Sequence, residues 1–178
     1  MKKLKLQELG RVDLATYRQA EKIPVCILLD NVRSLHNVGS TFRTADAFSI
    51  EKIVLTGITG QPPHREIQKT ALGATESVQW EHDDDVLHAV EQLKAQGYEI
   101  ALVEQTTHSV SLEEFKLEAG KKYCFVFGNE VQGVSDSIVG QADCAIEIPQ
   151  SGTKHSLNIS VCVGIVMYDV YQKIKQLR

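Results

Sequence analysis

The sequence has no long hydrophobic run and no excess of positive charge. No stretch approaches the roughly 18 consecutive apolar residues that a membrane-spanning helix needs, and the first residues are basic without the apolar core of a signal peptide. We therefore expect a cytoplasmic protein that does not contact membranes. The formal net charge of -4, from 19 Lys and Arg against 23 Asp and Glu, excludes a uniformly basic chain, so contact with nucleic acid would need a local cationic patch.

Closely spaced cysteines are also absent. Cys26, Cys124, Cys144 and Cys162 have apolar neighbours, and no two of them form a CxxC-type pair. We expect them to be buried, reduced thiols. The histidines show no metal-ligand spacing, so no metal site is expected.

The residues that are present predict one domain. A chain of 178 residues with 43% hydrophobic residues is long enough for a substantial core. Helical patterns, most clearly over Asp83–Gln96, alternate with short, nearly continuous apolar runs that predict buried strands. This alternation predicts an α/β fold with a parallel sheet covered by helices. Residues 1–22 are a short N-terminal extension, and residues 23–178 are the predicted domain. The apolar runs are Val25–Leu29, Ile53–Leu55, Ile100–Val103, Tyr123–Phe127 and Ala145–Ile148.

Small and polar residues follow the first predicted strand. Gly39 and Ser40 would open a helix over Ser40–Phe48, and the free backbone N–H groups of a helix N-terminus favour an anion such as a phosphate. Arg43 would lie about one turn into this helix, close to whatever its N-terminus holds. An ordinary N-cap by Asn37 or Ser40 explains the same pattern without a ligand.

Two later predicted strands also end in glycine, proline or polar residues. The predicted strand Tyr123–Phe127 ends in Gly128, which removes a side chain where a ligand could approach the backbone, although any tight turn after a strand shows this pattern. The predicted strand Ala145–Ile148 stops at Pro149, crosses a polar loop and leads into a long closing helix from Ser156. Ser156 is either a simple N-cap of that helix or part of a site.

Three segments of the chain resemble, in the same order, the three motifs of the SpoU/TrmH family, the 2'-O-ribose RNA methyltransferases of the SPOUT superfamily. The resemblance runs from about Pro24 to about Tyr171. It is most specific in the third segment, where the residues from Ser156 to Ser160 closely match the family's Ser-Leu-Asn-Val-Ser. The segments are Asn31–Arg43, Phe125–Gly133 and Ile146–Ser160.

The resemblance implies a fold and an assembly beyond what periodicity gives. The expected fold is a Rossmann-like parallel sheet flanked by helices, with a C-terminal deep trefoil knot. Members of the family are homodimers that pack through the knot region. Many relatives carry a separate N-terminal RNA-binding domain, to which residues 1–22 do not correspond, so recognition is expected to use the catalytic surface of a dimer or another protein.

The resemblance also implies a reaction and its residues. The family transfers a methyl group from S-adenosylmethionine to a ribose 2'-hydroxyl in tRNA or rRNA, and no metal is required. The implied catalytic residues are Asn37, Arg43, Glu130, Ser156 and Asn158. The implied cofactor-binding residues are Glu104, Gly128, Ile148 and Leu157. RNA contact is expected at Arg33, His36, Arg43, His64, Arg65 and Lys69, in stretches with few acids.

Two roles are open for Arg43. The usual proposal for the family makes this arginine the general base that accepts the hydroxyl proton. An arginine is effectively always protonated in proteins, which favours a second role. In that role the guanidinium stabilises the developing alkoxide and grips a neighbouring phosphate through two hydrogen bonds.

Two other functions compete with this hypothesis. A catalytically inactive RNA-binding module could retain the knotted fold, but the complete set of implied catalytic residues argues against it. An ordinary doubly wound nucleotide-binding protein should show GxGxxG or GxxxxGK[ST] after its first strand. The sequence there has neither motif.

Overall fold

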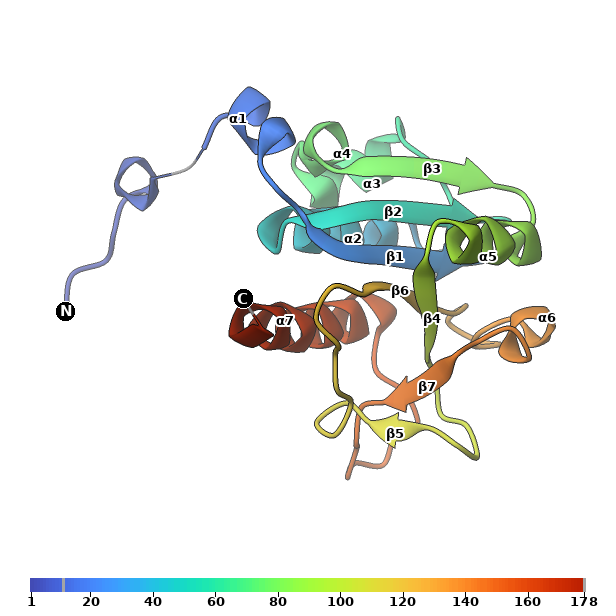
Figure 1. Cartoon of the computed structure of the whole chain (residues 1–178). Coiled ribbons are helices and arrows are strands. Elements are labelled where there is room, and N and C mark those ends of the chain that lie inside the picture. Colours follow the sequence, from blue (N-terminus) through green and yellow to red (C-terminus); the bar gives the residue numbers. More distant parts are fainter. Residues whose placement is uncertain (11, 178) are drawn as a thin grey trace.

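The computed structural model describes residues 1–10 and 12–177. Its centre is a seven-stranded sheet in the order β3-β2-β1-β6-β4-β7-β5, and every neighbouring pair of strands is parallel (Figure 1). The predicted parallel α/β fold is therefore confirmed, whereas the trefoil knot stays a prediction. The strands are β1 (Ile23–Asp30), β2 (Ile50–Thr56), β3 (Gln79–Asp83), β4 (Tyr98–Val103), β5 (Val110–Ser111), β6 (Lys122–Phe127) and β7 (Cys144–Glu147).

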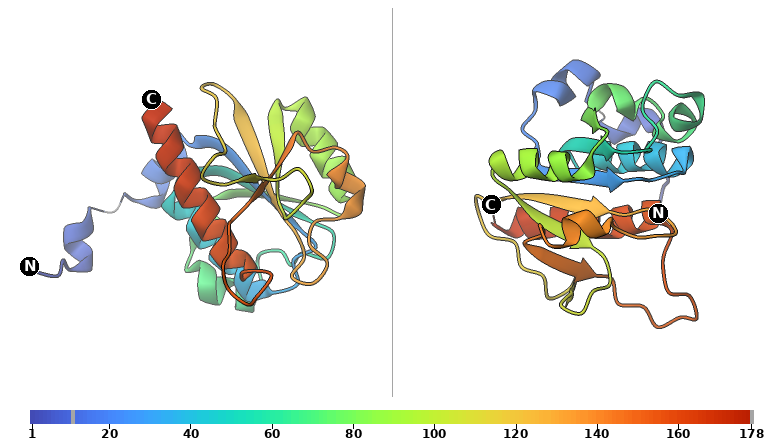
Figure 2. Two further views of the ribbon diagram at one scale, coloured as in Figure 1. Left: turned by 90° about the horizontal axis from the view of Figure 1, so that it is seen from below. Right: turned by 90° about the vertical axis from the view of Figure 1, so that its right-hand side faces the viewer.

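Helices cover both faces of the sheet. One hydrophobic cluster joins the sheet to α2, α3, α4 and α7, and a second joins its other face to α5 and α6. The left view in Figure 2 shows α7 on one side of the sheet and α5 and α6 on the other. The helices are η1 (Leu6–Leu9, a 3-10 helix), α1 (Leu14–Gln19), α2 (Leu35–Ala47), α3 (Arg65–Ala71), α4 (Ala74–Ser77), α5 (Val86–Ala95), α6 (Asp136–Val139) and α7 (Ile159–Leu177).

The central strand β1 shows why continuous apolar runs form this sheet. Ile27 faces the cluster under α2 and α7, and Leu28 faces the cluster under α5. Successive side chains of a strand point to opposite faces, so a strand covered on both sides must be apolar throughout. Cys26 on β1 and Cys124 on β6 are paired in register and fully buried, and burial raises the pKa of the Cys26 thiol. All four cysteines are free, although Cys144 and Cys162 are only half-buried.

Strands β3 and β5 were not predicted from the sequence. Each is an edge strand with a single neighbour, so it needs no continuous apolar run. Strand β3, with the sequence QWEHD, is partly exposed along its whole length. Strand β5 contains only two residues.

The predicted starts of two helices are wrong. Helix α2 begins at Leu35, and its N-cap is Ser34, whose side chain accepts a hydrogen bond from the Asn37 N–H at 3.3 Å. Gly39 therefore lies inside the helix, where a Cβ would collide with the backbone oxygen of Ile67 on α3. This glycine serves helix packing, and the anion-binding helix start predicted at Gly39 and Ser40 does not exist.

Helix α7 begins at Ile159, so Ser156 is not its N-cap. The side-chain oxygen of Asn158 accepts hydrogen bonds from the Ser160 N–H at 2.9 Å and from its hydroxyl at 2.7 Å. Asn158 thus caps the helix. Ser156 is left in the exposed segment before it.

The N-terminal extension packs on the domain through α1. The Tyr17 hydroxyl donates to the backbone oxygen of Asp46 at 2.8 Å, and the Arg18 guanidinium donates to the backbone oxygen of Glu76. The division between residues 1–22 and the domain stays a prediction. Within residues 1–10 and 12–177, no helix is long and apolar enough to cross a membrane.

Candidate active site

A cavity of about 540 Å³ lies at the carboxyl ends of β4, β6 and β7. Val103, Phe127 and Glu147, the last residues of these strands, lie on its wall with the loops that leave them. Ligand sites of open parallel sheets occupy this position. The cavity brings together many of the residues expected at the site: Glu104, Gly128, Glu130, Ile148, Ser156, Leu157 and Asn158.

A chain of hydrogen bonds joins the three motif segments. The side-chain amide of Asn37 donates to Glu130 Oε1 at 3.2 Å, and the side-chain amide of Asn158 donates to Asn37 Oδ1 at 3.3 Å. Asn37 is buried in the first turn of α2, whereas Glu130 and Asn158 line the cavity. Three residues that are far apart in the sequence are therefore fixed relative to one another.

The carboxylate of Glu130 also holds the segment before α2. It accepts hydrogen bonds from the backbone N–H groups of Arg33 and Ser34, both at 3.1 Å. Partial burial raises the pKa of Glu130, but hydrogen bonds from Arg33, its own N–H, Ser34 and the Asn37 amide outweigh this effect and leave the pKa lowered. Glu130 is thus suited to remain ionised and to position Asn37.

The turn after β6 explains Gly128. Asn129 and Gly133 exchange backbone hydrogen bonds of 2.8 and 3.0 Å, which folds the turn back onto Gly128. A Cβ at Gly128 would collide with the backbone of Gly133 and Val134. The backbone of the chain, not a ligand, therefore makes the close approach that requires a glycine at this position. Gly128 also lines the cavity.

Asp30 is a buried carboxylate that the sequence analysis did not single out. At the end of β1, it accepts hydrogen bonds from the Ser135 N–H at 2.7 Å, the Ser135 hydroxyl at 3.0 Å and the Asn31 side-chain amide at 2.7 Å. Asn129 donates to the backbone oxygen of Asn31 at 2.7 Å. Asp30 thus anchors the turn that carries Glu130. An acid at the end of an otherwise apolar strand is the sequence signal that would have found it.

Glu147 and His155 also line the cavity and were not among the predicted site residues, and Gln105 lines it beside the predicted Glu104. The Gln105 side chain donates to the backbone oxygen of His155 at 3.0 Å, which ties the loop after β4 to the loop before α7. Both Gln105 and Glu147 lie at strand ends. The position of a residue at the carboxyl end of a parallel strand would have identified them.

Arg43 does not lie where the sequence predicted. Because α2 begins at Leu35, Arg43 is more than two turns from the helix start, and its side chain is exposed. It is not among the described residues that line the cavity. In residues 1–10 and 12–177, no hydrogen bond or ion pair holds its guanidinium. The fold of a single chain therefore does not bring Arg43 to the other predicted catalytic residues.

The sequence profile of the SpoU rRNA Methylase family matches residues 24–168. This chain belongs to that family. A Staphylococcus saprophyticus protein, provisionally named a TrmH family tRNA/rRNA methyltransferase, is 29% identical over 160 residues, which are 90% of this chain and 63% of that protein. The chain thus spans a little under two thirds of the curated relatives that it matches.

Solved structures of the same family have this fold. The A. aeolicus TrmH/SpoU tRNA modifying enzyme, known from a crystal structure, is 29% identical, with a TM-score of 0.79 over 92% of this chain and 83% of that one. An AdoMet-bound rRNA methyltransferase from Sinorhizobium meliloti is 24% identical, with a TM-score of 0.79 over 88% of this chain and 59% of that one. The second likeness shows the fold alone.

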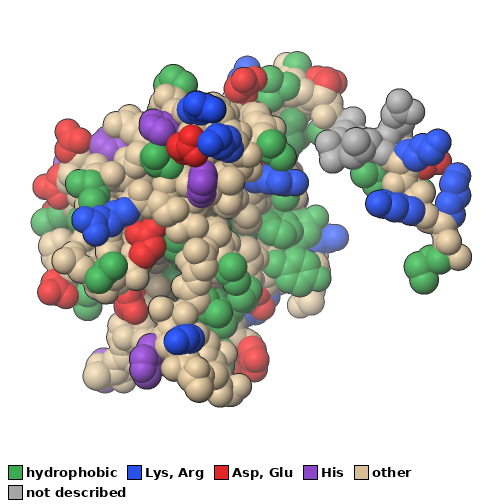
Figure 3. Space-filling view, turned by 180° about the vertical axis from the view of Figure 1, so that it is seen from behind, with side chains coloured by type: hydrophobic (Ala, Val, Ile, Leu, Met, Phe, Trp, Pro, Cys, Tyr) green, Lys and Arg blue, Asp and Glu red, His purple; other side chains and the backbone are tan. Residues whose placement is uncertain are grey.

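In this SpoU family chain, the residues predicted to contact RNA form a second region beside the cavity. We call it the α2–α3 surface, and all of its members are exposed. Figure 3 shows Lys, Arg and His side chains close to one another at the top of the face that includes these helices. The surface consists of Arg33, His36, Arg43, His64, Arg65 and Lys69.

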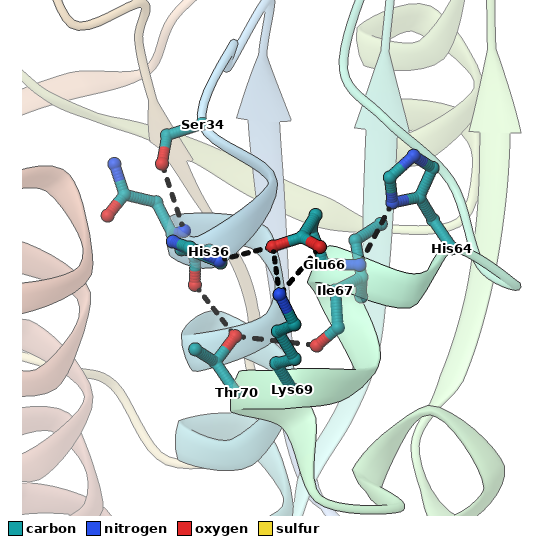
Figure 4. Close-up of polar contacts among 8 residues, drawn as sticks. Ser34, His36, His64, Glu66, Ile67, Lys69 and Thr70 are labelled. Carbon is teal, nitrogen blue, oxygen red and sulfur yellow. Dashed lines mark hydrogen bonds and ion pairs between the residues drawn. The ribbon is translucent and has the colours of Figure 1, made fainter.

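One acid organises part of this surface. Glu66 lies 3.0 Å from the His36 ring and 2.7 Å from the Lys69 ammonium (Figure 4). Its pKa is lowered, first by the hydrogen bond from Lys69 and then by that from His36. His64 caps α3, because its Nδ1 accepts the Glu66 N–H at 3.1 Å. Glu66 therefore neutralises part of the positive charge on the α2–α3 surface.

The described residues contain no group of three or more His, Cys, Asp or Glu side chains arranged to hold a metal ion.

Proposed function

We propose that this chain transfers a methyl group from S-adenosylmethionine to a ribose 2'-hydroxyl of tRNA or rRNA. The observation that carries the proposal is the hydrogen-bonded chain from Glu130 through Asn37 to Asn158 at the edge of a ligand-sized cavity. Family membership supports it, since the relatives are named as tRNA/rRNA methyltransferases. Of the solved relatives, the Sinorhizobium meliloti enzyme binds AdoMet.

The cavity fits the cofactor in size and in the character of its wall. Its volume of about 540 Å³ lies within the ~300–1,000 Å³ of small-molecule sites. Ile148 and Leu157 supply apolar surface for an adenine ring, and backbone groups around them are proposed to bind the adenine and ribose. Glu104 and Gly128 contribute another wall. When bound, S-adenosylmethionine supplies the methyl group as part of a sulfonium.

The polar edge of the cavity is proposed to receive the attacking ribose. Methyl transfer from a sulfonium is an in-line displacement, so alignment and stabilisation of the attacking oxygen are the main tasks. Ser156 and Asn158 line the transfer site, and Asn37 fixes the side chain of Asn158. Glu130 holds Asn37 in turn.

A homodimer would complete the site. Helix α7 exposes apolar side chains, with Val161 48%, Ile165 38% and Tyr168 55% exposed, and contiguous exposed apolar surface favours a partner. Helices α2 and α7 pack side by side, so Arg43 lies on a neighbouring helix. We infer that two copies pack through these helices and that Arg43 of one copy serves the cavity of the other.

A complementation assay tests this arrangement. Arg43→Ala and Asn158→Ala chains, carrying different tags, are co-expressed, and heterodimers are purified and assayed with labelled cofactor on tRNA and on rRNA. If Arg43 acts across the dimer, each variant alone is inactive but the heterodimer contains one intact site and regains activity. If Arg43 acts in its own chain, both sites of the heterodimer are damaged and it stays inactive.

The position of Arg43 away from the cavity of its own chain favours one alternative, a catalytically inactive RNA-binding module. Calorimetry with S-adenosylmethionine separates the two functions. Binding supports the methyltransferase, and RNA binding without cofactor binding supports the module. RNA contact is assigned to the α2–α3 surface in both cases, and both functions imply a cytoplasmic location.

A further inference from the structure

Three glutamates lie around the cavity. Glu104 follows β4, Glu130 lies in the turn after β6, and Glu147 ends β7. The described residues that line the cavity include no lysine and no arginine, and His155 is the sole basic side chain among them. The chain therefore gathers acids at one site without gathering cations.

Each carboxylate is held by neutral donors. Glu104 accepts backbone N–H bonds from Val134 at 3.1 Å and from the next residue in the sequence at 2.9 Å. Glu147 accepts the hydroxyl of Ser109 at 2.9 Å, and Glu130 accepts two backbone N–H groups and an amide. The ion pairs among residues 1–10 and 12–177 include none of these three acids. Their positions are thus fixed, and no ion pair among the described residues of the same chain compensates their charge.

These carboxylates determine which ligand charge the cavity prefers. Glutamate side chains carry a negative charge at neutral pH, and attraction to a nearby cation is several-fold stronger in a partly enclosed site than in bulk water. The cavity should therefore favour a cation and disfavour phosphate groups. This property argues against the rival nucleotide-binding protein, whose ligand carries phosphates.

We propose that Glu104 and Glu147 make the cavity discriminate between the two forms of the cofactor, an inference that rests on the proposed function. In the reaction the bond from the methyl carbon to sulfur breaks, the bond from that carbon to the ribose oxygen forms, and the hydroxyl proton passes to solvent water. Sulfur keeps the electron pair, so the sulfonium becomes a neutral thioether. S-adenosylhomocysteine therefore has one positive charge fewer than S-adenosylmethionine, and the acidic cavity holds the substrate form more tightly than the product.

The test is calorimetry on the full chain with three probes at low salt. The probes are S-adenosylmethionine, S-adenosylhomocysteine and sinefungin, which carries an amine where the first has its sulfonium. The variants are Glu104→Gln and Glu147→Gln. Glu147→Gln keeps an acceptor oxygen for the Ser109 hydroxyl, and Glu104→Gln keeps an acceptor for one of its two backbone N–H partners. Glu113→Gln, at an exposed position outside the cavity, is the matched control, and thermal melts of every variant verify folding.

The wild type is expected to bind both cationic probes more tightly than S-adenosylhomocysteine. Each cavity variant should weaken both cationic probes by about five- to tenfold and S-adenosylhomocysteine by about threefold or less, as expected for the loss of one nearby charge. Glu113→Gln should change neither. A folded variant that weakens all three probes equally overturns the inference while the proposed function stands. A wild type that binds none of the probes overturns the proposed function itself.

Discussion

The cavity and the α2–α3 surface lie on either side of one helix and have opposite charge. The two regions meet around the start of this helix: the Arg33 N–H contacts Glu130, His36 contacts Glu66 on α3, and Asn37 contacts Glu130 and Asn158 at the cavity. In the cavity, acids are held by neutral donors. On the α2–α3 surface, Arg and Lys side chains predominate, and one acid, Glu66, pairs with Lys69 and lies within hydrogen-bond distance of the His36 ring.

This difference shows that a net charge of -4 says little about individual sites. A polyanion and a small cation are the two ligands of the proposed reaction, and each has a region of complementary charge. Helix α2 separates the two regions and belongs to both. Substitutions on the two sides of this helix should therefore affect different ligands.

The largest effects are expected from Arg43 and Asn158. Replacing either with alanine should lower kcat by about 10²–10³-fold, the usual cost of losing a group that stabilises developing charge. Arg43→Ala should leave cofactor affinity within about twofold of the wild type, because the groups proposed to contact Arg43 are the attacking ribose oxygen and an RNA phosphate, not the cofactor. Asn158→Ala should weaken the cofactor.

Single-turnover rates and calorimetry measure these two quantities, with Gln92→Ala on α5 as the control. If Arg43→Ala and Asn158→Ala weaken cofactor binding equally, the prediction that only Asn158 affects the cofactor is wrong.

A pH–rate profile of Arg43→Lys distinguishes the two roles proposed for Arg43. Rescue at raised pH supports a general base, and no rescue supports a bidentate cation.

Substitution of two closely packed glycines should affect the cavity and the α2–α3 surface separately. Gly128→Ala forces a Cβ into the turn after β6, and Gly39→Ala forces one into α3. Each should destabilise the protein by about 1–3 kcal/mol, the usual cost of overpacking. Gly128→Ala should chiefly weaken cofactor binding, and Gly39→Ala should chiefly weaken RNA binding.

Thermal melts and the two binding assays check this expectation. Gly140→Ala is the control, because nothing lies within 4 Å of the Cβ position at Gly140. If both glycine variants weaken binding of the same ligand, a packing change in one region also affects the other, and the expectation is wrong.

The α2–α3 surface should respond to salt. Arg65→Ala and Lys69→Ala should each weaken RNA binding several-fold and lower the slope of log K against log salt by about 0.7–0.9 per lost phosphate contact. Filter binding over a salt series measures this slope. Cofactor affinity should be unchanged, and Lys116→Ala, which lies outside both regions, should change neither quantity.

Glu130 should make stability depend on pH. Its pKa is lowered in the folded state, so its contribution to stability is present above the pKa of the unfolded chain and is lost as pH falls through the folded value. Glu130→Gln should therefore lower Tm relative to the wild type at pH 7, and the two Tm values should converge as pH falls through the folded pKa of Glu130. A difference in Tm that stays constant throughout an acid titration would contradict this role of the carboxylate.

The smallest effect should come from Glu66→Gln. Without the negative charge, Lys69 is no longer neutralised, and RNA binding should tighten by about two- to threefold, as for other exposed ion pairs. Filter binding beside Glu113→Gln measures this change. Weaker RNA binding would show that Glu66 holds the cations in a required arrangement.

Buried parts of the fold were predictable from the sequence because burial on both faces leaves a continuous apolar run, as in β1. Strand β3 was not, since one of its edges faces solvent. The start of α2 was predicted wrongly because the sequence does not distinguish a glycine that begins a helix from a glycine inside a helix that lets a second helix approach closely. The bond between Asn37 and Asn158 joins residues that no local pattern connects, and only the family motifs placed both at one site.

The bond between Asn37 and Asn158 also has a consequence for how the molecule is made. It links the start of α2, the first long helix of the chain, to the residue that caps the last one, so the pocket is unfinished until α7 has docked. During synthesis, a chain halted before Asn158 would contain all seven strands of the sheet and no complete ligand site. Capture on an immobilised cofactor analogue should therefore separate fully folded molecules from those that stopped short.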